Sequence, residues 1–272
     1  MKRLSPFNIT ALTLGFAFLY LPMILLVIYS FNESKLVTVW VGFSTKWYGE
    51  LLRDQAFLDA AVVTIKVAVL SSTFATVLGT MAAYVLVNGG RFMGRTVFSG
   101  MIYAPLVMPE VITGLSLLLL FIGIGLDRGV LTIVLAHTTF AMCYVSVVVS
   151  SRLVSFDRSL EEAALDLGCN RFDAFRLVTL PIIAPAVISG WLLAFTLSLD
   201  DLVIASFVSG PSSTTLPIKI WSSVRLGVSP EINALSTMMI GIVTIGVISA
   251  SLISKRNSVR AQKDAQAAER SA

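Results

Sequence analysis

The segment Ser159 to Pro181 reads SLEEAALDLGCNRFDAFRLVTLP and is a polar insert in a chain that is otherwise strongly apolar. Ser159 is followed three residues later by Glu162, which matches a capping box and predicts that a helix begins at Leu160. A helix this short is not stable alone, so an apolar face on it predicts a partner surface. Apolar residues do recur at the spacing of one helix face: Leu160, Ala163, Ala164 and Leu167.

A second short helix is expected in the same insert. Gly168 is placed to end the first helix in a left-handed conformation, which glycine adopts without steric cost. Asn170 is placed to cap the second helix, which we expect to end near Leu180 and Pro181. The segment therefore predicts a small helix-turn-helix knob. From these features alone, an ordinary loop between two membrane helices is an equal alternative, and the rest of the chain must decide between them.

The composition is that of an integral membrane protein. Of the 272 residues, 56% are hydrophobic and 13% are charged, which excludes a soluble globular domain. The formal net charge is +4, and the basic residues lie between apolar runs and in the last segment, so nucleic acid is not an expected partner. Cys143 and Cys169 lie in different segments and have no metal-ligand spacing, so we expect neither a disulfide nor a metal site.

Long apolar runs predict an all-α membrane fold with six spanning helices in one domain that covers residues 1–272. A short amphipathic segment around Trp47 predicts a further helix along the membrane surface. Pro105 and Pro109 interrupt the third span, and such an interruption is tolerated in a membrane only against protein or a water-filled cavity. The predicted spans are residues 8–31, 60–87, 96–122, 130–150, 182–208 and 231–254.

The basic residues orient these spans. With both termini on the cytoplasmic side, the inner segments hold thirteen Lys and Arg residues and the outer segments hold six, which agrees with the positive-inside rule. Residues 158–181 then form a cytoplasmic loop, and residues 255–272 form a cytoplasmic tail. The predicted knob is therefore placed where a soluble partner can reach it.

Three acidic residues lie within the predicted spans: Glu110, Asp200 and Asp201. A charge at the centre of a bilayer costs roughly 2.5 to 3.5 kcal/mol on insertion scales, so such residues usually face a protein interior or a water path. On a continuous helix, Asp201 shares a stripe of small residues with Ser198, whereas Asp200 lies among large apolar side chains. These residues predict an anionic pathway for a cationic solute. The alternatives are acids that reach the headgroups or pair with a neighbouring helix, and a stripe that only packs closely.

Other candidate chemistry is sparse. His137 lies within the fourth span, where buried packing with one hydrogen bond is the default expectation and a proton relay is the alternative. The sequence contains no phosphate-binding loop, no nucleophile elbow and no zinc-protease motif. We therefore expect no catalytic residue, no metal ligands and no cofactor bound by this chain.

The insert also resembles a known signature. Glu162-Ala163-Ala164, then Gly168 four residues after Ala164, then Leu180-Pro181, is similar to the EAA motif in permease subunits of bacterial binding-protein-dependent ABC importers. The resemblance implies the type I (MetI-like) ABC importer permease fold and a location in the bacterial inner membrane. It further implies that the insert is a coupling helix that docks onto a cytoplasmic ATPase. The implied docking residues are Leu160, Glu161, Glu162, Ala163, Ala164, Leu167 and Gly168.

Further segments resemble the polyamine-import branch of the same family. They include APLVMPEVITGLSLLLLF at 104–121, ISGWLLAFTLSLDDLVIASFVSGP at 188–211 and VSPEINAL at 228–235. The likeness covers roughly residues 14–252 and implies a transport subunit for putrescine, not an enzyme. The implied partners are a second homologous permease, an ATPase dimer that carries ATP and Mg²⁺, and a periplasmic polyamine-binding protein.

Two other functions are compatible with parts of this pattern. Spermidine or another cationic solute is the alternative within the importer class. An ion-coupled secondary transporter also uses intramembrane acids, but the sequence shows no inverted repeat of the kind found in many such folds. An intramembrane enzyme would need a paired catalytic constellation, which His137 and Cys143 do not supply.

Overall fold

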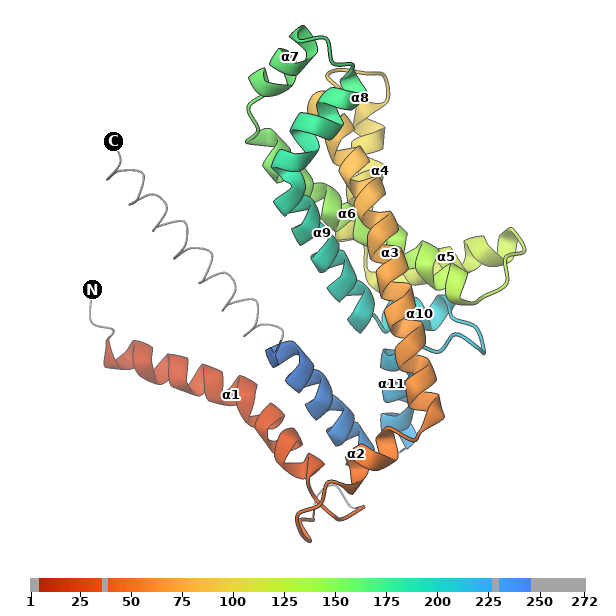
Figure 1. Ribbon diagram of the computed structural model, residues 1–272. Helices are drawn as coiled ribbons and strands as arrows, with labels where there is room; N and C mark the ends of the chain where they lie inside the picture. The colour runs from red at the N-terminus through yellow and green to blue at the C-terminus, as the bar shows by residue number, and fades with distance from the viewer. Residues whose placement is uncertain (1–4, 36–38, 227–229, 246–272) are drawn as a thin grey trace. The chain divides into compact units, whose positions relative to one another are not determined.

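The computed structural model describes residues 5–35, 39–226 and 230–245, and within these ranges the secondary structure is helical. The one extended pairing in the described ranges is an isolated bridge between Asn32 and Phe43. The helices (Figure 1) are α1 (Pro6–Ser30), α2 (Lys46–Leu51), α3 (Gln55–Asn88), α4 (Arg95–Val107), α5 (Glu110–Gly123), α6 (Val130–Val154), α7 (Ser159–Asp166), α8 (Arg171–Ala174), the π-helical turn η1 (Phe175–Thr179), α9 (Leu180–Asp200), α10 (Val203–Val208), α11 (Leu216–Leu226) and a further helix, Pro230–Ile245.

The chain forms two compact units. The first unit comprises residues 1–55 and 223–272, and the second comprises residues 56–222. Among the described residues, the first unit contains α1, α2 and the helix Pro230–Ile245, together with Gln55 of α3 and residues 223–226 of α11. The second unit contains the rest of α3 and α11 and the other helices. That residues 1–272 make one domain stays a prediction.

In the first unit, the buried side chain of Asn32 organises the segment that follows α1. Its amide nitrogen donates to the carbonyl of Val39 at 2.7 Å, and its amide oxygen accepts from the N–H of Val41 at 3.1 Å. The indole N–H of Trp47, on α2, donates to the carbonyl of Asn32 at 2.7 Å. A buried amide is stable here because its hydrogen-bonding groups have partners. Most side chains of α1 itself are exposed, as expected of a helix whose neighbours are lipid or another chain, and Ser30 at its C-terminal end is buried.

In the second unit, α6 is the most buried of the long apolar helices in the described ranges, with 67% of its most apolar window buried. It packs with α3 and α9 on one side and with α5 and α10 on another. Glycines allow close approach: a Cβ built on Gly79 of α3 would lie 2.7 Å from the carbonyl oxygen of Met142. A Cβ on Gly190 of α9 would lie 3.2 Å from Val145. Small residues therefore bring α3 and α9 against α6, as the composition of these helices predicts.

Four helices in the described ranges are long and apolar enough to cross a membrane, or five if the bent pair α4 and α5 is one span. The first, second and fourth predicted spans coincide with α1, α3 and α6. The helix Pro230–Ile245 covers the first part of the sixth predicted span. Residues 246–254 of that span and the predicted tail 255–272 lie outside the described residues.

The third predicted span, residues 96–122, is interrupted as predicted, but at Pro109 only, since Pro105 lies inside α4. Its two parts, α4 and α5, are bent by 117° relative to one another at Met108 and Pro109. Pro109 has no N–H with which to continue the helix, and it disfavours a helical conformation for the residue before it. Met108 accordingly has an extended ψ of 137°.

The fifth predicted span, residues 182–208, begins too late and ends too late. A single helix of 30 residues runs from Arg171 to Asp200, so the predicted helix end near Leu180 and Pro181 is wrong. The π-helical turn η1 ends at Thr179, two residues before Pro181. A π-helical turn takes up an extra residue and accommodates a proline whose ring would otherwise clash with the preceding turn. The C-terminal part is the separate helix α10, because the chain is extended at Asp201.

Candidate functional site

The predicted knob is present as α7 and α8, which lie at one end of the second unit (Figure 1). Its start differs from the prediction. Ser159 is the first residue of α7, the preceding Arg158 has helical dihedral angles, and there is no side-chain cap, so the predicted capping box of Ser159 and Glu162 is wrong. The N–H of Ser159 instead donates to the carboxylate of Asp157 at 3.0 Å. That hydrogen bond to the charged form lowers the pKa of Asp157.

The turn between the two helices matches the prediction. Gly168 has φ +94°, a left-handed conformation that side chains disfavour, and open space surrounds the position of its missing Cβ. Asn170 caps α8, with its side-chain oxygen accepting from the N–H of Asp173 at 2.9 Å. The angle between α7 and α8 is therefore fixed by backbone conformation and a cap rather than by packing at the glycine.

The α7 helix presents most of the predicted docking residues to solvent. Leu167 is 87% exposed, Leu160 is 47% exposed, and Glu162 and Ala163 are also exposed. Of the predicted apolar face, Ala164 alone is buried, at 9% exposed. Exposed leucines on a short helix next to a carboxylate form a surface suited to a protein partner.

Glu161 has a different place from its neighbours. Its side chain turns inward, where one carboxylate oxygen accepts from the hydroxyl of Tyr84 on α3 at 2.7 Å. The other oxygen accepts from the hydroxyl of Thr179 at 2.9 Å, and Thr179 is fully buried. Arg158 adds a hydrogen bond to the carbonyl of Val87 at 2.7 Å. These contacts fasten the base of the knob to α3 and to η1. Sequence reasoning grouped Glu161 with the docking surface, because nothing in the local pattern links it to Tyr84 or Thr179.

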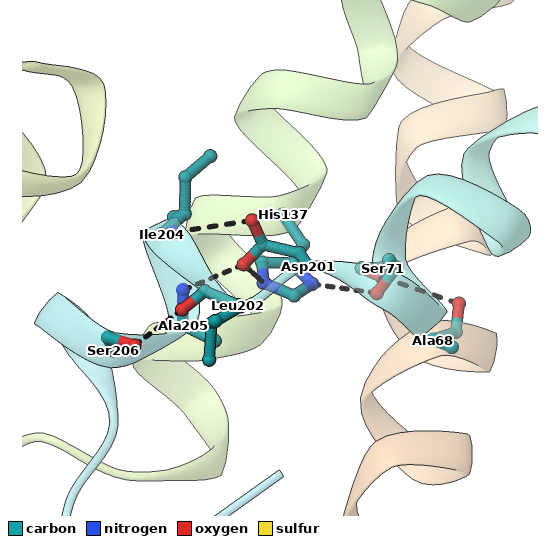
Figure 2. Close-up of polar contacts among 9 residues, drawn as sticks. Ala68, Ser71, His137, Asp201, Leu202, Ile204, Ala205 and Ser206 are labelled. Atoms are coloured by element: carbon teal, nitrogen blue, oxygen red, sulfur yellow. Dashed lines mark hydrogen bonds and ion pairs between the residues drawn. The ribbon is translucent and has the colours of Figure 1, made fainter. Parts of the chain in front are cut away.

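A second polar feature lies inside the unit, between α3, α6 and α9. His137, on α6, is 2% exposed. One ring nitrogen, Nδ1, lies 2.7 Å from the hydroxyl of Ser198, and the other, Nε2, lies 3.0 Å from the carboxylate of Asp201. The hydroxyl of Ser71, on α3, donates to Ser198 at 3.0 Å. Figure 2 shows His137 between Asp201 and Ser71. The default expectation of one hydrogen bond for His137 is therefore wrong, because both ring nitrogens have partners.

Asp201 also holds the junction of α9 and α10. Its carboxylate accepts from the N–H of Ala205 at 2.7 Å and from the N–H of Ile204 at 3.3 Å (Figure 2). A carboxylate in this place satisfies N–H groups at a helix start that have no partner within the helix. The side chain of Asp201 is 8% exposed. Pairing with a neighbouring helix, one of the alternatives for the acids in the spans, is the geometry found for Asp201.

Of the remaining predicted pathway residues, Glu110 and Asp200 are exposed and Ser198 is buried. Glu110 is the first residue of α5 and is exposed, and a carboxylate is favoured at a helix N-terminus. Asp200 is the last residue of α9 and is also exposed. Ser198 is 5% exposed and belongs to the cluster through His137. No group of three or more His, Cys, Asp or Glu side chains that would hold a metal ion occurs in the described parts of the chain.

Comparison with known proteins links both features to one family. A family model described as the binding-protein-dependent transport system inner membrane component matches residues 75–262, a range that contains the knob and, of the buried cluster, His137, Ser198 and Asp201. The putrescine transport system permease protein PotI of Escherichia coli K12 is 59% identical over 273 residues, which cover 98% of this chain and 97% of that protein. The spermidine/putrescine transport system permease protein PotC of the same strain is 43% identical over 244 residues, covering 90% and 92%.

Solved structures show the same fold. A chain of a bacterial ABC transporter involved in the import of the acidic polysaccharide alginate has a TM-score of 0.70 at 18% identity, and the match covers 93% of this chain and 98% of that chain. A chain of the inward-facing methionine ABC transporter MetNI has a TM-score of 0.59 at 15% identity, with 76% and 95% covered. The predicted ABC importer permease fold is therefore confirmed. This multi-pass membrane chain belongs to the family of binding-protein-dependent transport system inner membrane components.

Proposed function

We propose that this chain is a permease subunit of an ATP-driven importer that carries putrescine across the bacterial inner membrane. The observation that supports this most strongly is the 59% identity with PotI, because it extends over nearly the full length of both chains and so includes the spans as well as the knob. Spermidine is the second candidate solute, and the 43% identity with PotC favours it.

Uptake of radiolabelled putrescine tests the solute. The chain is expressed with its partner subunits in cells that lack other polyamine importers. We expect uptake that requires the chain and is competed more strongly by unlabelled putrescine than by spermidine. Stronger competition by spermidine would favour the second candidate, and the absence of polyamine uptake in cells that contain the assembled complex would contradict the proposal.

In the proposed assembly, the chain pairs with a second homologous permease, and an ATPase dimer binds ATP and Mg²⁺ on the cytoplasmic side. A periplasmic polyamine-binding protein delivers the solute, and both termini of this chain are cytoplasmic. The exposed residues Leu160, Glu162, Ala163 and Leu167 contact a groove on the ATPase, and Gly168 sets the turn behind them. The exposure of these side chains supports this role.

Transport follows an alternating-access cycle in this proposal. Closure of the ATPase dimer moves the knob, and because the base of the knob is hydrogen-bonded to α3 and η1, the movement reaches the membrane helices. Putrescine carries two positive charges at neutral pH, so acids along the path lower the barrier to its entry without holding it tightly. Glu110, Asp200 and Asp201, with Ser198, are the proposed pathway residues. Their placement at helix ends and at the break between α9 and α10 supports this role, because irregular backbone in a membrane borders protein or a cavity.

The energy source separates this proposal from an ion-coupled secondary transporter. We expect an ATPase subunit to copurify with the chain, and we expect uptake to stop when ATP is depleted while the proton gradient is maintained. Uptake that instead follows the proton or sodium gradient without ATP would support the secondary transporter.

A further inference from the structure

A pocket lies at the same end of the second unit as the knob. It has a volume of about 660 Å³ and is bordered by the C-terminal end of α3, the first half of α4 and the C-terminal end of α6. Its polar lining includes Arg95, Arg158, Thr96, Ser99 and Ser150. None of these residues belongs to the predicted coupling or pathway sets.

The charge of this pocket is positive. Arg95 donates to the carbonyl of Leu86, and Arg158 donates to the carbonyl of Val87, each at 2.7 Å. The two guanidinium groups are thus anchored on consecutive residues at the end of α3. A guanidinium has further N–H donors in a planar arrangement suited to phosphate oxygens. Neither arginine forms an ion pair with a carboxylate in the described ranges, and no acidic side chain lines the pocket.

One polar group in the wall has no partner. The hydroxyl oxygen of Ser150, on α6, is buried and makes no hydrogen bond within the described parts of the chain. A buried hydroxyl without a partner costs about 1 to 3 kcal/mol, so a ligand that supplies an acceptor here would recover that cost. The hydroxyls of Thr96, Ser99 and Tyr103 line the same space. The lining therefore offers donors of both kinds, charged and neutral, to one anion.

Part of the pocket lining is apolar. Leu86, Val87 and Val154 line it beside the arginines, and Val154 is 75% exposed. Free phosphate has no group that would cover an exposed apolar side chain such as Val154, whereas a phospholipid has acyl chains next to its phosphate. Basic pockets between membrane helices are suited to anionic lipid headgroups.

We propose that this pocket binds the headgroup of an anionic phospholipid, with the phosphate held by Arg95 and Arg158 and an acyl chain lying against Val154. The lipid then packs against the residues that begin α7, because Arg158 both lines the pocket and precedes the knob. The proposal rests on the membrane location of the family and does not depend on which solute is carried.

Native mass spectrometry of the permease, purified with its complex in mild detergent, tests this binding. Phosphatidylglycerol is the probe, and phosphatidylethanolamine is the zwitterionic comparison. Thr96→Glu places a carboxylate in the pocket and leaves both arginine contacts to α3 intact; the position is exposed and lies in the first turn of α4, where an acid is favoured. We expect Thr96→Glu to weaken phosphatidylglycerol binding by about tenfold, because the new carboxylate repels the phosphate and competes with it for the N–H donors of the arginines.

Two matched variants control for structure and for general charge. Thr96→Gln has a side chain of the same size as Thr96→Glu without the charge and keeps a neutral donor, so we expect it to bind the lipid more tightly than Thr96→Glu. Arg152→Gln removes a positive charge from the same end of α6, outside the pocket lining, and we expect no effect. Arg95→Gln should reduce binding, with thermal unfolding measured in parallel because Arg95 also contacts Leu86.

Three results would overturn the proposal. Equal binding of phosphatidylglycerol to Thr96→Glu and Thr96→Gln would show that the pocket does not hold the headgroup. Displacement of the lipid by millimolar inorganic phosphate would assign the pocket to a free anion instead. Loss of the ATPase subunit from the complex in Thr96→Glu, with lipid binding unchanged, would assign the surface to a protein partner.

Discussion

Asp201 connects the junction of α9 and α10 to the neighbouring helix α6. Its carboxylate pairs with His137 and caps α10 through the N–H groups of Ile204 and Ala205. The expected pathway role depends on its negative charge, whereas the cap depends only on an oxygen acceptor. Substitutions that remove the charge but keep or lose the acceptor therefore separate the two roles.

We predict that Asp201→Asn retains most of the stability, because the amide oxygen still accepts from α10. Asp201→Ala should lower the unfolding free energy by about 0.5 to 2 kcal/mol from the lost cap, with a further cost from the unpaired His137. Under the proposed function, both variants lose polyamine uptake. Thermal unfolding of the purified complex and uptake in cells measure these effects. Normal stability of Asp201→Ala would refute the capping role, and normal uptake by Asp201→Asn would remove the charge from the transport mechanism.

The α7 helix has one face that contacts its own protein and one face that is exposed. Glu161 and Ala164 point toward the unit, whereas Glu162 and Leu167 point outward. Two adjacent glutamates are thus expected to act differently. This pair offers a comparison in which the same substitution, at neighbouring positions of one helix, tests fastening and docking separately.

We predict that Glu161→Ala lowers stability, because Thr179 is fully buried and loses its acceptor, a cost of about 1 to 3 kcal/mol. Glu162→Ala should leave the unfolding temperature unchanged and should reduce solute-stimulated ATPase activity. The measurements are thermal unfolding of the complex and ATPase assays with and without the solute-loaded binding protein. Equal unfolding temperatures for the two variants would contradict the inward position of Glu161.

The packing of the whole second unit depends on close approach between long helices. Gly79 allows α3 to approach the backbone of α6 at Met142, and Gly190 allows α9 to approach α6 at Val145. In a membrane, lipid is as apolar as the side chains, so such backbone contacts contribute more to helix association than burial of apolar area. Substitution at these glycines should therefore affect the unit as a whole.

We predict that Gly79→Ala destabilises the protein by about 1 to 3 kcal/mol, because its Cβ would lie 2.7 Å from the carbonyl oxygen of Met142 and the helices must separate. Gly100→Ala, within α4, is the control, since nothing lies within 4 Å of its Cβ position. It should keep or raise the unfolding temperature. Fluorescence-detected thermal unfolding in detergent compares the two, and a similar response from both would argue against the close α3–α6 contact.

Features that depend on neighbouring residues are predicted from the sequence, whereas features that depend on distant contacts are not. Long apolar runs predict α1, α3 and α6 well, because hydropathy and length are local properties. Gly168 and Asn170 are predicted correctly for the same reason: a left-handed turn and a side-chain cap involve only neighbouring residues. The local rule was wrong at Ser159. Its N–H donates to the carboxylate of Asp157, which precedes the helix, and not to the side chain of Glu162 as a capping box predicts.

The sequence by itself determined that this chain is a helical membrane protein, where the knob lies and which family it belongs to, because composition, spacing and signature are carried by contiguous residues. Only the tertiary structure decided that Pro181 lies inside a helix, that Asp201 ends one, and that His137, Ser71 and Ser198 meet. These outcomes depend on contacts between residues more than sixty positions apart or on how a turn absorbs a proline. Local periodicity contains no information about either.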